Sequence, residues 1–330
     1  MEEVNQSNSL NGFPNIGNTC YMNAALQCLK ACKELTIILK KHTHIELVYF
    51  YINLIGMNSN PNMENIPINI RIGNFKMSLN KIPCFNMFRT NHPHDSHEFI
   101  VAFFDYLCET IYENVNTSSL RPDIHLTDDT KMAINDWLFA FKNKYSDIAE
   151  IFYGQYMSTV QCAHNHKSKR FDPFQILELN VLDDPNVNTK TDLSFSIVDC
   201  IQFQMRPNNI TEYNCEKCNH VCEAEKTLTF FRLPHILVIK VSRWNFDGEH
   251  IIKTLILNEY LNFSPENRYM LFACVCHIGN RDGGHYISLI KHTDNCAYKI
   301  DDMSVEKQTP EQASELITRF GYMFFYKKQM

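Results

Sequence analysis

The feature that most constrains this sequence is a change of hydrophobic periodicity, from helical spacing to strand-like runs. In the first third, apolar residues recur at the spacing of amphipathic helices, at Tyr21, Ala25, Cys28, Leu29 and Cys32 and again at Phe99, Ala102, Phe103, Tyr106, Leu107 and Ile111. The last half offers short apolar runs at Ile236–Val241, Tyr269–Cys276, Tyr286–Ile290 and Tyr298–Ile300. Helices followed by strands predict an α+β fold with a cleft between a helical lobe and a sheet lobe.

The 330 residues could form one large domain or two small ones. No internal repeat and no long Pro, Gly or Ser tract divides the chain, which favours one multi-lobed domain. Polar stretches at 56–67, 113–131 and 181–192 predict surface loops or insertions. The first two of these loops are where we expect partner recognition to be built in.

Charge and terminal composition exclude several classes of protein. The formal net charge is −6, and no run of Lys and Arg forms a stripe typical of nucleic-acid or anionic-lipid binding. The first ten residues are acidic and polar, unlike a signal peptide, and no apolar run reaches transmembrane length. We therefore expect a soluble, monomeric protein of the cytoplasm or nucleus, with no nucleic-acid or membrane partner, and its 13 cysteines should be mostly reduced.

Cys20 stands where a turn-rich stretch passes directly into the first helical pattern. This position predicts that Cys20 lies in the opening turn of a helix, with Asn18 or Thr19 placed to cap it. The positive end of a helix and a nearby histidine can lower the pKa of a thiol from about 8.5 to about 4–7. Cys20 is therefore a candidate nucleophile, although a cysteine chosen at random is more often an inert core residue.

Two distant segments supply the partners that a nucleophilic thiol needs. Gly283 and Gly284 precede His285 and Tyr286, and the glycines would let the backbone of an extended substrate pass close to the imidazole. Asp301 lies 16 positions after His285, at the end of a strand-like run. A thiol at a helix start, a histidine on one strand and an acid after the next form the arrangement of a thiol protease, whereas each alone reads as a core, surface or turn residue.

The residues around these positions resemble the motifs of the ubiquitin-specific protease family. Residues 12–23, Gly-Phe-Pro-Asn-Ile-Gly-Asn-Thr-Cys-Tyr-Met-Asn, resemble its cysteine box. Residues 269–279, 283–286 and 301–302 together resemble its histidine box. Further matches lie at 94–100, 224–226, 233–244 and 321–326. The resemblance therefore runs from about residue 12 to 326 in the family's order.

The resemblance implies a papain-like fold with thumb, palm and fingers. We expect a short polar tail at 1–11 and a single catalytic domain at 12–328, with a helical thumb at about 12–145 and fingers at about 150–230 within a β-rich palm at about 146–328. The implied partners are ubiquitin and ubiquitinated proteins. The fingers would hold the globular body of ubiquitin while its tail enters the thumb–palm cleft, where Gly283, Gly284 and Tyr286 would line the channel.

The implied reaction is hydrolysis of the amide or isopeptide bond after the terminal glycine of ubiquitin, without a catalytic cofactor. Cys20 would be the nucleophile, His285 its general base and acid, and Asp301 the group that orients His285. Asn15, five residues before Cys20, matches the family's oxyanion-stabilising side chain and would act with the Cys20 backbone N–H, although Asn also favours turns. Asp302 is a secondary candidate for catalytic support, because adjacent acids are common in turns.

His97 and Glu98 could be mistaken for a second acid–base pair. Residues 95–98 also read as a capping box, with Asp95 as N-cap and Glu98 reaching back, and we assign them to helix initiation and cleft support. Pro93 and His94 replace the family's more usual polar lead-in and could shift this helix.

Cys215 and Cys218 have the spacing that lets two thiolates reach one metal, and many family members complete a zinc site at the fingertips with a second such pair. Here the second pair is incomplete, because Asn165 stands where the partner of Cys162 would be. His164 or His166 could replace it, giving three sulfurs and one nitrogen, which is ordinary for a structural zinc.

Two observations weigh against zinc. His220 and Cys222 crowd the same region, and some family members have lost the metal while keeping the fingers. Three other functions stay open: cleavage of a ubiquitin-like modifier or general papain-like endopeptidase activity, a weakly or non-catalytic ubiquitin-binding module, and a metal-held interaction protein. The last would require the Cys/His set to matter more than Cys20.

Overall fold

The computed structural model describes residues 10–57, 65–114, 126–142, 144–181, 194–243, 254–280, 283–292 and 296–329. The chain divides into two compact units: Met1–Ala102 with Phe272–Gly321, and Phe103–Leu271 with Tyr322–Met330. Most of the three predicted loops lies outside the described residues. Both units contain helices and largely antiparallel strands, which confirms the α+β prediction. In the described ranges, no helix is long and apolar enough to cross a membrane.

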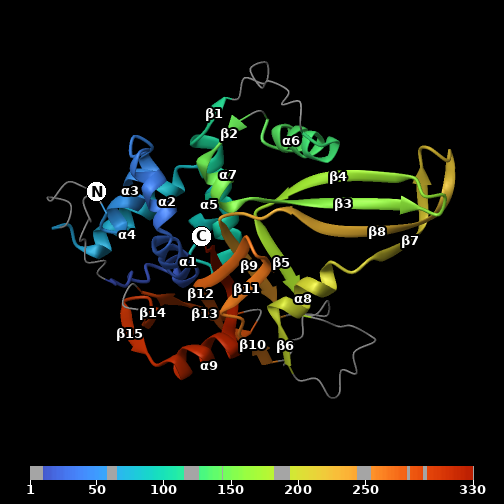
Figure 1. Ribbon diagram of the computed structural model, residues 1–330. Coiled ribbons are helices and arrows are strands. Elements are labelled where there is room, and N and C mark those ends of the chain that lie inside the picture. Colours follow the sequence, from blue (N-terminus) through green and yellow to red (C-terminus); the bar gives the residue numbers. More distant parts are fainter. Residues whose placement is uncertain are drawn as a thin grey trace. The chain divides into compact units, whose positions relative to one another are not determined.

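The first unit starts with a group of helices, blue to cyan in Figure 1. They are α1 (Cys20–Ala31), α2 (Lys33–Lys40), α3 (Glu46–Leu54), α4 (Ile68–Asn80), the 3-10 helix η2 (Pro83–Arg89) and α5 (Ser96–Thr110), whose residues from Phe103 belong to the second unit. In α1 the whole stretch Cys20–Leu29 is buried. A helix buried on all sides requires an almost uncharged sequence, and this stretch contains no charged residue.

The sheet of the first unit is antiparallel and covers one side of α1. Its strands are β12 (Asn267–Asn280, in this unit from Phe272), β13 (Gly283–Lys291), β14 (Ala297–Asp301) and β15 (Ser304–Gln308), followed by α9 (Pro310–Phe320). Helix α1 packs against β13 and β14, and α9 packs against β14 and β15. The predicted strand-like runs lie within β12, β13 and β14, and the helix that begins at Cys20 therefore lies against the strands that carry His285 and Asp301.

The described residues of the second unit form further helices and strands. The helices are α6 (Asp128–Ala140), α7 (Asp147–Phe152) and α8 (Ile197–Gln204). Strand β5 (Ile176–Asn180) runs parallel to β9 (Ile236–Ser242), β9 pairs antiparallel with β16 (Gly321–Lys328), and β11 (Tyr260–Ser264) pairs with the start of β12. Two short pairs are β1 (Glu113–Asn114) with β2 (Lys144–Tyr145) and β6 (Ser194–Ser196) with β10 (Thr254–Ile256).

A four-stranded antiparallel sheet forms a long arm of the second unit (Figure 1). Its strands β3 (Gly154–Cys162), β4 (Lys167–Phe174), β7 (Asn208–Cys215) and β8 (His220–Arg232) have the order β4-β3-β8-β7. At the tip, Asn165 and Asn219 have φ of 64° and 55°, a left-handed conformation that asparagine tolerates better than most residues. These two turns bring the Cys and His residues at 162–166 and 215–222 to one end of the arm.

Candidate active site

Cys20 is the first residue of α1, as predicted, but the expected cap of this helix is wrong. Thr19 occupies the N-cap position without capping the helix through its side chain. Asn18 has φ +52° and faces away from the helix start, donating a hydrogen bond to the carbonyl of Asn91. It is Asn15 that anchors the start, because its Oδ1 accepts a hydrogen bond of 3.0 Å from the Thr19 N–H.

The thiol of Cys20 lies in a largely buried environment, with the residue 9% exposed. Burial raises the pKa of this thiol, the charge of Asp302 raises it further, and hydrogen bonds from backbone N–H groups, foremost that of Tyr286, only partly oppose this. The lowered pKa expected from the helix end is therefore not found. A raised pKa favours the neutral form of the thiol, so a nucleophilic Cys20 would need a base to remove its proton.

His285 and Asp301 meet on neighbouring strands of the same unit. The Nε2 of His285 lies 2.6 Å from Oδ1 of Asp301, with side chains 40% and 35% exposed. If Nε2 carries the proton of this bond, Nδ1 is the ring nitrogen left to accept one. The Tyr286 N–H points at the Cys20 sulfur, so the thiol lies beside the residue that follows His285. In the part of the chain that the structure describes, no hydrogen bond joins Cys20 to His285 themselves.

Asp302 ties the segment before Cys20 to the end of β14. It occupies the two-residue turn before β15 with φ +48°, and its Oδ2 accepts a hydrogen bond of 3.1 Å from Asn15 Nδ2. Its Oδ1 accepts one of 2.7 Å from Asn23 Nδ2, and its carbonyl accepts the N–H of Phe13 at 2.9 Å. Sequence reasoning missed Asn23, although a polar residue within an otherwise apolar buried helix was a usable signal.

These contacts leave Asn15 with one amide hydrogen that can point at a reacting carbonyl. Its Oδ1 is held by the Thr19 N–H, and one of its two N–H groups is held by Asp302. The N–H of Cys20 belongs to the first turn of α1, where backbone donors lack an intrahelical partner. The Asn15 side chain and the Cys20 backbone N–H therefore both lie at the start of α1.

Gly283 and Gly284 open β13 and pair with Asn280 and Gly279 of β12. A side chain at Gly284 would collide with the ring of His277, whereas the space at Gly283 is nearly open. The second glycine thus has a packing reason for its identity, whereas the first has open space around its Cα and donates its N–H to Asn280 Oδ1 at 2.9 Å.

The segment before α5 starts a helix, as predicted. Asp95 is its N-cap, since Oδ1 accepts a hydrogen bond of 2.7 Å from the His97 N–H, while the reach-back of Glu98 stays a prediction. His94 packs edge-on against Tyr21 with 5.4 Å between ring centroids, and burial lowers its pKa. His94 thereby adds an aromatic contact between this lead-in and α1.

The tip of the arm in the second unit brings the predicted metal ligands together. One nitrogen or sulfur atom from each of Cys162, His166, Cys215 and Cys218 lies within 4.8 Å of the others. The set comprises three sulfurs and one nitrogen, so these residues fit a tetrahedral structural zinc. His164 belongs to a second group instead, with Cys162, Cys218 and Cys222.

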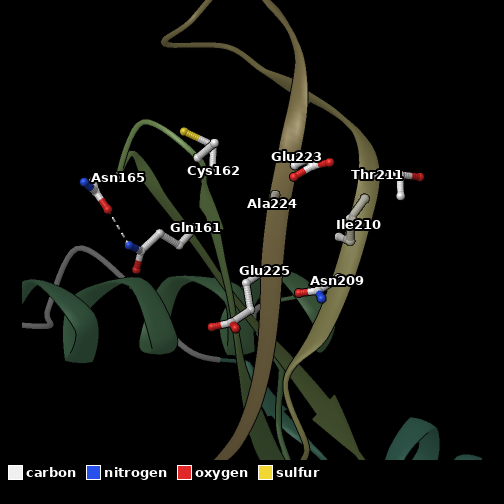
Figure 2. Close-up of a pocket in the computed structure, with 10 residues that line it drawn as sticks. Gln161, Cys162, Asn165, Asn209, Ile210, Thr211, Glu223, Ala224 and Glu225 are labelled. Carbon is white, nitrogen blue, oxygen red and sulfur yellow. Dashed lines mark hydrogen bonds between the residues drawn. The ribbon is translucent and has the colours of Figure 1, made fainter.

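A pocket of about 530 Å³ adjoins the cluster on the arm (Figure 2). Glu223 and Glu225 line it from β8, and Asn209 lines it from β7. Asn165, the residue in place of the missing cysteine, accepts a hydrogen bond of 2.8 Å from the side chain of Gln161. The side chain of Asn165 therefore bonds to Gln161 and is not among the possible metal ligands.

Comparison with known proteins identifies relatives along nearly the whole chain. The family profile described as "Ubiquitin carboxyl-terminal hydrolase" matches residues 11–326. "Ubiquitin carboxyl-terminal hydrolase Usp2" of Drosophila melanogaster is 25% identical over 98% of this chain and 35% of its own length. "Ubiquitin carboxyl-terminal hydrolase 5" of Saccharomyces cerevisiae is 26% identical over 96% of this chain and 44% of its own length. The chain thus spans less than half the length of these two curated relatives.

Solved structures share the fold at low sequence identity. A chain of the SAGA Ubp8/Sgf11/Sus1/Sgf73 DUB module bound to ubiquitin aldehyde aligns with a TM-score of 0.73 and 18% identity, covering 99% of this chain and 71% of that one. A chain of the same module bound to monoubiquitin aligns with a TM-score of 0.74 and 19% identity, covering 98% of this chain and 70% of that one. The predicted papain-like α+β fold of a ubiquitin-specific protease is confirmed by these likenesses.

Proposed function

The chain belongs to the ubiquitin carboxyl-terminal hydrolase family, and from that premise we propose that it is a cysteine-type deubiquitinase. Its substrate is the amide or isopeptide bond that follows the C-terminal glycine of ubiquitin. The observation that carries the proposal is the 2.6 Å bond between His285 and Asp301, next to a buried thiol at the start of α1. Cys20, His285 and Asp301 belong to one compact unit, which supports their proposed roles as nucleophile, base and orienting acid.

Reaction begins with transfer of the Cys20 proton to Nδ1 of His285, which moves into contact with the sulfur when substrate binds. Asp301 holds the ring through Nε2 and stabilises the imidazolium that forms. The thiolate attacks the glycine carbonyl, and His285 returns the proton to the leaving amine. Water activated by the same imidazole then hydrolyses the thioester, which releases the ubiquitin carboxylate and restores the thiol.

Because the pKa of Cys20 is raised, His285 must remove the thiol proton during the reaction. In a site that keeps the thiol neutral, attack requires the proton to leave as the carbon–sulfur bond forms. The N–H of Cys20 and the free N–H of Asn15 would then stabilise the oxyanion. Asp302 acts as a positioning residue, because it holds Asn15 through one oxygen and Asn23 through the other.

Gly283, Gly284 and Tyr286 form the proposed channel for the ubiquitin tail. An extended tail that ends in glycine needs close backbone contact, which the open space at Gly283 permits. Tyr286 lies one residue from the base, and its backbone already contacts the nucleophile. The second unit would contribute the fingers, where a structural zinc would link the turns that carry Cys162 and Cys215.

The proposed partners are ubiquitin and its conjugates, which places the activity in the cytoplasm or nucleus. The aligned structures contain ubiquitin aldehyde or monoubiquitin, together with the further subunits named in that module. The expected monomeric state and the lobe boundaries stay predictions for this chain.

Hydrolysis of a fluorogenic amide at the C terminus of ubiquitin tests the function. The native chain should cleave it, Cys20→Ser should not, and Cys84→Ser, which alters an exposed thiol, should match the native chain. Cleavage of a ubiquitin-like substrate in place of ubiquitin would correct the substrate and keep the mechanism. A folded native chain that binds ubiquitin and cleaves neither would refute the enzyme and favour a binding module.

A further inference from the structure

The tip of the arm carries more metal donors than one tetrahedral ion can use. One nitrogen or sulfur atom from each of Cys162, His166, Cys215 and Cys218 lies within 4.8 Å of the others, and the same holds for Cys162, His164, Cys218 and Cys222. Both groups contain three sulfurs and one nitrogen, the donor set of a structural zinc. The two groups share the thiols of Cys162 and Cys218.

The distances between several of these donor atoms lie near those expected around a bound zinc. With Zn–S of about 2.3 Å and Zn–N of about 2.0–2.1 Å, tetrahedral geometry separates two sulfurs by about 3.8 Å and a sulfur from a nitrogen by about 3.6 Å. The shared sulfurs of Cys162 and Cys218 are 3.8 Å apart. In the first group, His166 Nδ1 lies 3.2 Å from Cys218 Sγ and 3.8 Å from Cys215 Sγ. In the second group, His164 Nδ1 lies 3.6 Å from Cys218 Sγ.

The ring of His164 is already oriented toward the sulfurs. It packs edge-on against His220, with 5.4 Å between ring centroids. His220 is itself directed elsewhere, because its Nδ1 lies 2.9 Å from the Cys218 carbonyl and it belongs to neither donor group. Packing against His220 restrains this exposed ring while its Nδ1 lies 3.6 Å from the sulfur of Cys218.

We propose that this tip binds two zinc ions bridged by the thiolates of Cys162 and Cys218. His166 and Cys215 complete the coordination of the first ion, and His164 and Cys222 complete that of the second.

Charge balance favours the pair over a single ion. Four thiolates and two divalent cations sum to zero, and both histidines bind as neutral imidazoles. A single zinc in the first group would leave a net negative charge, with the Cys222 thiol and the His164 ring lying unused beside its sulfurs. Cys162 and Cys215 are buried, so an uncompensated charge there is costly, and a second cation removes it.

The four thiols lie in or beside two hairpin turns. Asn165 and Asn219 close the turns with positive φ, and the register of β7 and β8 places Cys215 opposite His220 and Cys222 opposite Tyr213. Ala224 of β8 and Tyr213 of β7 belong to the same packed cluster as the buried thiols. The bridged pair would therefore fasten both turns of the arm to one centre.

Zinc titration of the 330-residue chain tests the proposal. After dialysis against a chelator, zinc is added in the presence of a chromophoric competitor, and bound zinc is counted by elemental analysis. The native chain should saturate at two equivalents, and His164→Ala and Cys222→Ser should each saturate at one. His44→Ala is the control, because it removes an exposed imidazole of the first unit that belongs to neither group, and this variant should keep two. Cobalt supplies an independent readout, since two thiolate-bridged Co(II) ions couple magnetically and weaken the paramagnetic signal per ion.

Saturation of the native chain at one equivalent would overturn the proposal. Two equivalents in both His164→Ala and Cys222→Ser would also overturn it, because the second ion would then lie elsewhere. None of these counts depends on hydrolase activity, so the result stands apart from the fate of the proposed function.

Discussion

Replacing Asn15 by alanine separates the proposed oxyanion role from a purely structural one. The side chain of Asn15 is exposed, and its contacts are the 3.0 Å bond from the Thr19 N–H, a 3.4 Å bond from the Thr19 hydroxyl and the 3.1 Å bond to Asp302. Loss of a helix-start hydrogen bond of this kind costs about 1 kcal/mol of stability. Loss of one oxyanion donor raises the barrier by about 3–4 kcal/mol, which lowers kcat by about 10²- to 10³-fold.

The assay is steady-state hydrolysis of a ubiquitin C-terminal amide, paired with thermal unfolding of each variant. We expect kcat of Asn15→Ala to fall by about 10²- to 10³-fold with little change in KM, because the donor acts only on the transition state. Asn18→Gly is the control. It removes a side-chain hydrogen bond from the same loop and suits the φ of +52° at that position, so kcat should stay near native. If Asn15→Ala loses stability but keeps kcat within about threefold of native, the oxyanion reasoning is refuted.

Three further predictions rest on single groups. Asp301→Ala should lower kcat by about 10²- to 10⁴-fold. Asp301→Asn should lower kcat less, because its amide oxygen can still accept the hydrogen bond from His285 Nε2. Equal losses of kcat in the two variants would contradict an orienting role for Asp301. Alkylation of Cys20 by iodoacetamide should be slow at pH 7 and accelerate as pH rises through the raised pKa, and a rate plateau below pH 7 would contradict a neutral resting thiol. Burial lowers the pKa of Lys30 from 10.5 to about 8, so the unfolded chain binds more protons between these values and stability should rise with pH there. Denaturant titrations of Lys30→Met should lack this rise, and an unchanged pH profile would count against the buried position.

The sequence predicted the elements that periodicity specifies. Helix α1 and the strands β9, β13 and β14 lie where the spacing of apolar residues predicted them. This is because the positions that an element buries, on one face or on all sides, are occupied by apolar residues. The position of Cys20 at a helix start followed from a turn-rich lead-in.

What the sequence could not supply was the set of contacts between distant segments. Asn15 and Asn23 meet Asp302 across 287 and 279 residues, so no local pattern indicates their hydrogen bonds. The direction of the Cys20 pKa shift was also missed, because burial is a property of the packed helix and outweighs the helix terminus. The sequence indicated His164 as an alternative to His166 and Cys222 as a residue crowding the metal site, but only the geometry showed that His164 and Cys222 belong to a second donor group.

The central claim is that Cys20 is the nucleophile that attacks the C-terminal carbonyl of ubiquitin. It is tested most directly by reacting the chain with ubiquitin that carries a thiol-reactive electrophile at its C terminus and mapping the adduct by mass spectrometry. We expect a single adduct on Cys20, absent in Cys20→Ala and absent with probes built on ubiquitin-like modifiers. An adduct on another cysteine, or none on a folded chain that still binds ubiquitin, would contradict the account.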